Sequence, residues 1–324
     1  MPAASGSRSA AARFAWLVLA YVVAVIVWGA FVRATGSGAG CGAHWPLCNG
    51  EVVPRAPGLR MVIEFSHRVT SGLSLVAVVA LAVVAFRATR PGHPARAGAL
   101  GAVGFMILEA LLGAALVLFG LVADDRRPIR AVVLGVHLTN TFLLLATIAL
   151  TARWLGDPSR RGWPLRAGRA LGEGAVALAG VVAVAVTGGI AALGDTLFPA
   201  GSLAEGVAHD LSPAAHVLVR LRVWHPVIAV LVGLGLWAYA EAVRRNVSER
   251  LAGAARRVEG LVALQVVAGT VNLLLLAPTA LQLVHLLLAD LVWIALVLLV
   301  AGAVEQAPAP EPAAAPVAGA KLVR

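Results

Sequence analysis

The stretch that decides the fold runs from Met61 to Phe86 and reads MVIEFSHRVTSGLSLVAVVALAVVAF. It is almost wholly apolar, and it exceeds the about 20 residues that a helix needs to cross a bilayer. Near its start lie an acid, an imidazole and a guanidinium, Glu64, His67 and Arg68, and ionisable groups in such a segment are costly unless they bind, pair or react. Their spacing places all three on roughly one helix face. Two interpretations are open: a Glu64–Arg68 ion pair beside an interfacial histidine, or a carboxylate beside a metal ligand.

The composition of the chain indicates a polytopic membrane protein. Of its 324 residues, 60% are hydrophobic and 13% are charged, and its mean hydropathy of +0.88 is far above that of a soluble domain. Eight apolar runs are long enough to span a lipid bilayer. They lie at 14–32, 61–86, 97–122, 130–153, 170–193, 220–243, 254–276 and 280–303. The predicted fold is therefore all-α, with eight transmembrane helices and both termini on one side; the first run lacks a convincing cleavage site and is predicted to be retained.

The distribution of basic residues orients these helices. Of the 26 lysines and arginines, 17 fall at the termini and in the even-numbered connections, and 9 fall on the opposite side. By the positive-inside rule, the N- and C-termini are predicted to be cytoplasmic. The formal charge of +10 follows from loops that face anionic lipid, so no nucleic-acid partner is expected.

Four histidines suggest an internal duplication, because they occur in alternate predicted helices, each roughly two turns from the external end. They are His67, His137, His225 and His285. A short echo between residues 107–113 and 263–269, ILEALLG and ALQVVAG, supports the repeat. The prediction is two pseudo-symmetric four-helix bundles, an N-terminal half at 1–154 and a C-terminal half at 170–303. A cytoplasmic linker at 155–169 joins them, and a disordered cytoplasmic tail follows at 304–324.

Paired imidazoles on neighbouring membrane helices favour heme. Heme iron accepts two axial ligands on opposite faces of a large apolar ring, and neutral imidazoles supply them well. A closed zinc site would need four ligands at one point, whereas these histidines divide into two pairs. Only the first half has a carboxylate, Glu64, one turn before its histidine; the matching residue of the second half is Arg222. The first site is therefore interpreted as chemical and the second as an electron store.

The cysteines of the chain, Cys41 and Cys48, both fall in the first external loop, where an oxidising compartment permits a disulfide. A structural staple and a redox-active thiol pair both remain open. Glu109, in the middle of the third run, is either a hydrogen-bonded structural residue or part of a proton path.

Together these motifs resemble heme A synthase of the bacterial CtaA type, over roughly residues 14–303. The residues that carry the resemblance are Glu64-Phe65-Ser66-His67-Arg68, Thr35-Gly36-Ser37-Gly38, Trp45-Pro46-Leu47-Cys48-Asn49-Gly50, His137, His225 and His285. The resemblance implies an oxidoreductase of the bacterial cell membrane. Its substrate would be heme O, whose ring methyl group is hydroxylated and oxidised to the formyl group of heme A for cytochrome oxidase.

The resemblance also implies site residues and partners. His67 and His137 would flank the substrate heme, His225 and His285 would ligate the iron of a permanent heme b, and Glu64 would be the catalytic carboxylate. Cys41 and Cys48 would form a disulfide. Heme O synthase would be the upstream partner, and the resemblance names no electron acceptor. Residues 191–199 depart from the family pattern, which leaves the roles of His209 and His216 open.

Two rival functions fit parts of the same pattern. A diheme b-type membrane cytochrome that relays electrons from quinol would also need four histidines, whereas Glu64 and the stapled loop favour the enzyme. A transporter with a proton-coupled histidine layer would purify without colour. The sequence assigns no role to Asp290, in the last predicted helix.

Overall fold

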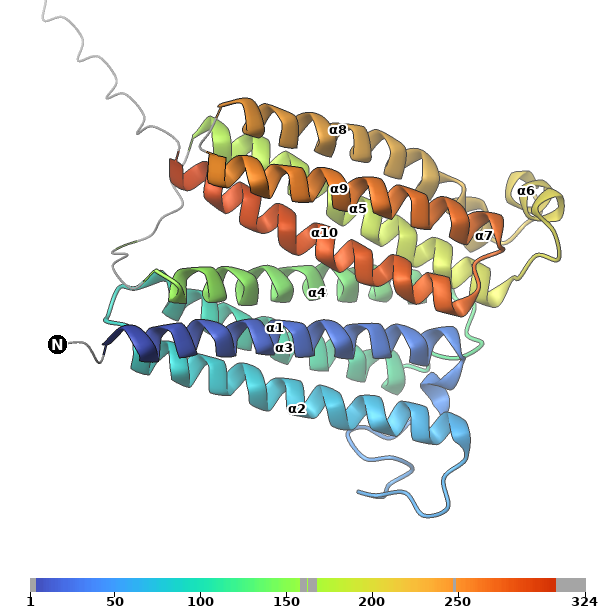
Figure 1. The fold of residues 1–324 in the computed structure, drawn as a ribbon. Helices are drawn as coiled ribbons and strands as arrows, with labels where there is room; N and C mark the ends of the chain where they lie inside the picture. Colours follow the sequence, from blue (N-terminus) through green and yellow to red (C-terminus); the bar gives the residue numbers. More distant parts are fainter. Residues whose placement is uncertain (1–3, 158–161, 163–167, 247–248, 307–324) are drawn as a thin grey trace, which may run out of the picture.

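A computed structural model describes residues 4–157, 162, 168–246 and 249–306, and over these residues the chain is built of helices (Figure 1). The elements are α1 (Ala4–Ala34), η1 (Ser37–Ala39), α2 (Leu59–Ala88), α3 (Pro94–Leu118), α4 (Pro128–Leu155), α5 (Arg169–Leu197), α6 (Leu203–Leu211), α7 (Val217–Arg222), α8 (Trp224–Asn246), α9 (Glu249–Leu274) and α10 (Thr279–Gln306). Eight helical segments of this part of the chain are long and apolar enough to cross a membrane. The predicted all-α fold with eight spans is confirmed.

The sixth span differs from the prediction in its construction, because α7 and α8 together make one apolar segment, Val217–Arg245. The short helix α6 was not predicted. Its N-terminus is capped by Ser202, whose side chain accepts a hydrogen bond from the backbone of Glu205 at 3.2 Å. Ser and Glu at this spacing are a helix-start signal in sequence. Most of the predicted linker and tail, residues 158–161, 163–167 and 307–324, lie outside the described residues.

The helices form two groups that lie one above the other in Figure 1. In the N-terminal half, α1 packs on α2, α2 on α3, α3 on α4, and α4 back on α1; in the C-terminal half, α5, α8, α9 and α10 pack in the same closed order. In each half the helices that carry the histidines, α2 and α4 or α8 and α10, are therefore diagonal partners. Their side chains can meet across the middle of a four-helix bundle, which agrees with the predicted pair of pseudo-symmetric bundles.

The two halves meet where α4 packs on α5 and α10, and where α1 packs on α10. Trp293 of α10 donates a hydrogen bond to the backbone oxygen of Phe142 in α4 at 2.6 Å, and the two rings stack with centroids 4.7 Å apart. Arg33 of α1 donates to Thr196 and Gln282, each at 2.8 Å. These bonds from one half to the other fix the halves relative to each other.

The ends of the bundle are unlike. We call the end that carries residues 35–58 and 198–216 the loop end; α2, α4 and α10 begin there, as does the α7–α8 span (Figure 1). Helix α1 begins and α10 ends at the opposite end (Figure 1). Both ends of the described chain therefore lie on one side, as an even number of spans requires.

Candidate functional site

All four histidines lie at one level, near the loop end. His67 in α2, His137 in α4, His225 in the α7–α8 span and His285 in α10 each follow the start of their segment by roughly two turns. Each side chain is half-buried. The structure therefore brings the histidines into one layer, two in each half.

The pair in the C-terminal half is the better defined. The rings of His225 and His285 lie with centroids 6.3 Å apart and planes at 85°. An imidazole nitrogen binds a metal at about 2 Å, and the ring centre lies about 1 Å beyond it, so two imidazoles on opposite sides of one iron have centroids roughly 6 Å apart. The observed separation fits two axial ligands of one iron.

Three of the imidazole rings pack directly against a glycine of a neighbouring helix, and we call each of these glycine contacts a seat. The seats pair Gly29 with His67, Gly188 with His225, and Gly269 with His285. A Cβ atom on any of these glycines would lie 2.8 Å from the ring's Cε1 atom, closer than side chains tolerate. The same contact thus recurs between α1 and α2, and between α5 and α8. Sequence reasoning missed these seats, although the signal was present as a glycine in each of the facing helices.

The fourth imidazole has a different neighbour. No atom lies near an added Cβ at Gly113. Instead, Oε2 of Glu109 lies 3.6 Å from Nδ1 of His137. At the matching place in the C-terminal half, the Gln265 amide nitrogen lies 3.4 Å from Nε2 of His285. The echo in sequence between 107–113 and 263–269 therefore corresponds to two helices that present a polar side chain to a histidine.

Each of the four imidazole rings has at least one nitrogen without a hydrogen bond, which is therefore available to a metal. The Thr187 hydroxyl donates to the Ala183 carbonyl at 2.9 Å and lies 3.3 Å from Nδ1 of His225. Nδ1 then donates to this hydroxyl, and Nε2 keeps its lone pair. Nδ1 is buried without a hydrogen bond in His67, His137 and His285. The glycine seats, the ring separation and the free ring nitrogens together fit a heme between His225 and His285. In the N-terminal half, the fit rests on the shared layer and on the Gly29 seat of His67.

Glu64 is buried, with 3% of the residue exposed, and both of its oxygens are engaged. Oε2 accepts a hydrogen bond from the backbone of Cys41 at 2.7 Å, and Oε1 forms an ion pair with Arg68 at 2.5 Å. Arg68 in turn donates to the backbone oxygens of His44 and Leu47. The Glu64–Arg68 pair is therefore present, and it holds the cysteine loop on the start of α2.

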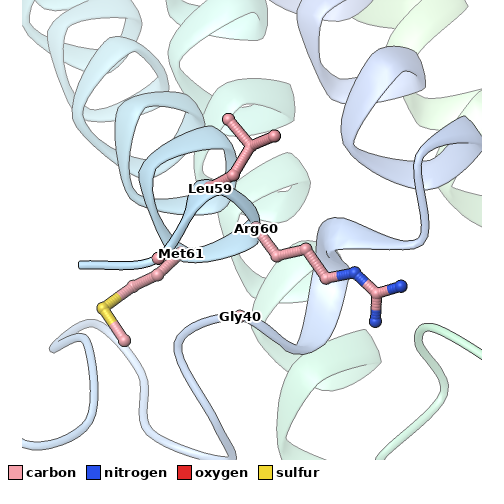
Figure 2. Close-up of a pocket in the computed structure, with 5 residues that line it drawn as sticks. Gly40, Leu59, Arg60 and Met61 are labelled. Carbon is pink, nitrogen blue, oxygen red and sulfur yellow. The ribbon is translucent and has the colours of Figure 1, made fainter.

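The loop itself is closed by a disulfide between Cys41 and Cys48, and both cysteines are buried. The backbone at Gly40 lies directly against that of Arg60 and Met61, since an added Cβ would be 2.6 Å from the Arg60 carbonyl. Figure 2 shows the hollow that Gly40 and the first residues of α2 line, with the side chains of Leu59, Arg60 and Met61 diverging from it. No histidine lines this hollow.

Arg222 anchors the other large loop. It occupies the position relative to His225 that Glu64 occupies relative to His67. Its guanidinium is buried and forms ion pairs with Asp195 at 3.0 Å and with Asp210. Each half thus holds its loop with a charged residue one turn before a histidine, but the charges are opposite.

The sequence left the roles of His216 and Asp290 open. The structure explains the first residue but not the second. Nδ1 of His216 accepts a hydrogen bond from the backbone of Leu218 at 3.3 Å and caps α7, and its ring stacks on Phe198. Asp290 is fully buried in α10, and neither of its carboxylate oxygens has a hydrogen bond. His216 is therefore structural, whereas nothing in the structure explains Asp290.

Comparison with known proteins identifies relatives along most of the chain. The COX15-CtaA family model, described as "Cytochrome oxidase assembly protein", matches residues 12–297. A Thermus thermophilus protein named "Protoheme IX farnesyltransferase" is 49% identical over 305 residues, which cover 91% of this chain and 48% of that protein. "Heme A synthase" of Halalkalibacterium halodurans is 39% identical over 130 residues, covering 40% and 42%, and that of Bacillus licheniformis is 40% identical over 126 residues, covering 39% of each. The chain spans about half the length, or less, of these curated relatives.

Proposed function

The chain belongs to the COX15-CtaA family of cytochrome oxidase assembly proteins, and we propose that it is an oxidoreductase that converts heme O to heme A. One observation carries the proposal: two imidazole pairs lie at one level, and the first has a buried carboxylate and a half-buried one at positions where the second has none. Glu64 lies one turn from His67, and Glu109 lies 3.6 Å from His137. Their counterparts beside the second pair are Arg222 and Gln265. Carboxylates beside the first pair suit a site where a reaction takes place, and their absence at the matching positions of the second pair suits a site that only stores electrons.

The histidines divide the work between two hemes. His225 and His285 hold the iron of a resident heme b, which supplies redox capacity when bound. His67 and His137 flank the substrate, heme O. The glycine seats at Gly29, Gly188 and Gly269 keep three of these rings in place. The functional halves are residues 1–154 and 170–303.

Glu64 stabilises charge at the substrate site. Its two oxygens accept hydrogen bonds from Arg68 and from the backbone of Cys41, which fix the position of the carboxyl group. A carboxylate fixed in this way would stabilise positive charge on a substrate bound beside it. In a bilayer this electrostatic effect is larger than in water.

The membrane orientation and the partner follow from the same residues. The disulfide between Cys41 and Cys48 requires an oxidising compartment, and the excess of arginine lies at the other end. The loop end and the heme sites therefore face the outside of a bacterial cell membrane, with both termini cytoplasmic. Heme O synthase supplies the substrate; the Thermus relative, whose name is that of a farnesyltransferase, contains a segment matching 91% of this chain.

Co-expression with a farnesyltransferase that makes heme O tests the function. The hemes are extracted from membranes of a host that lacks heme A and are separated by chromatography. Heme A is expected with the wild-type chain and not with an empty vector. A red protein that accumulates with heme O unconverted would favour the electron relay, and a colourless purified protein would favour the transporter.

The glycine seats give a test of heme binding that leaves every proposed ligand unchanged. In Gly269→Ala, the new methyl group would lie 2.8 Å from the His285 ring, and overpacking of this kind costs about 1–3 kcal/mol. We expect a clear loss of heme b per protein, measured by the visible spectrum. Gly260→Ala in the same helix, where no atom lies within 4 Å, is the control. Equal heme content in the two variants would contradict the role of the seat.

A further inference from the structure

We propose that Glu109 is a positioning residue that makes His137 a stronger electron donor to the substrate heme than His285 is to the resident heme. The inference rests on the proposed heme ligation and adds to it a cause for the difference between the two sites. Glu109 is a membrane-span carboxylate to which the proposed reaction assigns no specific task, and the sequence alone left it open whether it is structural or part of a proton path.

Two side chains of α4 contact the oxygens of Glu109. The Asn140 amide donates to Oε2 at 2.6 Å, and the Thr141 hydroxyl lies 2.5 Å from Oε1. Nδ1 of His137 lies 3.6 Å from Oε2. Asn140 and Thr141 are both buried, and both follow His137 by about one turn of α4. The carboxylate is therefore held by two side chains of the helix that carries the histidine, and it faces Nδ1 of the ring at 3.6 Å.

The C-terminal half has a neutral group at the matching position, which contacts the other ring nitrogen. Gln265 stands four residues before Gly269, as Glu109 stands four residues before Gly113. The Gln265 amide nitrogen lies 3.4 Å from Nε2 of His285, while Nδ1 of that ring and the Gln265 amide oxygen are buried without a hydrogen bond. The two halves thus place a polar side chain of the third helix beside the histidine of the fourth, but only in the first half is that side chain a carboxylic acid.

This difference has a known physical effect on a metal. A carboxylate that accepts the free N–H of a ligating imidazole raises the basicity of the ligand, and such outer partners tune the metal. A more basic ligand stabilises ferric over ferrous iron and so lowers the reduction potential. The first heme is then the better electron donor and the second the better acceptor.

Reciprocal substitutions test the inference. The full-length protein is purified with its resident heme, iron protoporphyrin IX is added to fill the first site, and both reduction potentials are measured by spectroelectrochemical titration. Glu109→Gln is expected to shift the first heme to higher potential and leave the second unchanged. Gln265→Glu is expected to shift the second heme to lower potential and leave the first unchanged. A purely structural role for Glu109 would lower stability or heme content without these opposite shifts.

The result that overturns the inference is an unchanged potential of the resident heme in Gln265→Glu at normal heme content. If Glu109→Gln fails to accumulate, the Gln265→Glu variant alone decides the test. This variant is expected to fold, because among the described residues the Gln265 side chain has only one hydrogen-bonding contact, that with His285. Failure of the proposed ligation has a different signature. His67→Ala and His225→Ala would then bind heme as the wild type does, whatever the potentials of the two reciprocal variants.

Discussion

Replacement of His225 or His285 by alanine is expected to remove the resident heme b from the purified protein. The two rings lie at the separation that one iron needs between them, and a lone imidazole cannot close the other face of the porphyrin. The visible spectrum and the heme-to-protein ratio measure the effect, which should approach complete loss. His67→Ala should keep the b-type spectrum and mainly impair binding of heme O.

The control for this set is another histidine of the loop end. His209 is exposed in the last turn of α6, so His209→Ala should retain the resident heme and its spectrum. Equal loss of heme b from the variants at His67, His137, His225 and His285 would refute the division into a substrate site and a resident site.

Replacement of Glu64 by glutamine should abolish formation of heme A while the resident heme b is retained. Removal of one preorganised electrostatic group costs an enzyme roughly 100-fold to 1,000-fold in rate. Glutamine keeps the size of the side chain and an acceptor for the Cys41 N–H, but it removes the negative charge. Heme extraction after co-expression measures the product. Unchanged heme A would show that the carboxylate is only an anchor for the loop.

Glu64 also anchors the cysteine loop, so a second variant is needed to separate its effect on the reaction from its effect on the loop. Combined replacement of Cys41 and Cys48 by serine opens the disulfide and loosens the loop, but leaves the carboxylate in place. We expect this variant to lose stability, by about 2–4 kcal/mol for a typical disulfide, and to keep most of its activity. If heme A formation vanished while the fold and heme b content persisted, Glu64 would act through the loop.

The fold could be predicted from the sequence because composition dominates it. A run such as 61–86 has no stable place outside a bilayer or a protein core, so its length alone indicates a span. Helix α6 was missed because it is short and lies in a polar loop, where the only sign was the capping pair Ser202 and Glu205. The two closed rings of helices agree with the predicted duplication.

The candidate site could be predicted only in part. The common layer of the four histidines could be predicted, because the distance of each histidine from the start of its helix can be counted in the sequence. The contacts that distinguish the two sites depend on how helices face each other. The Glu64 bond to the Cys41 backbone needs the path of the loop, and the Glu109 contact with His137 needs the rotation of α3 against α4. The assigned roles of these residues remain predictions.

The most direct test of paired histidine ligation is the low-temperature electron paramagnetic resonance spectrum of the oxidised protein purified with its resident heme. Ferric heme held by two imidazoles is low-spin, so we predict a low-spin signal that is lost in both His225→Ala and His285→Ala and kept in His209→Ala. A low-spin signal that persists unchanged in the first two variants would contradict the account.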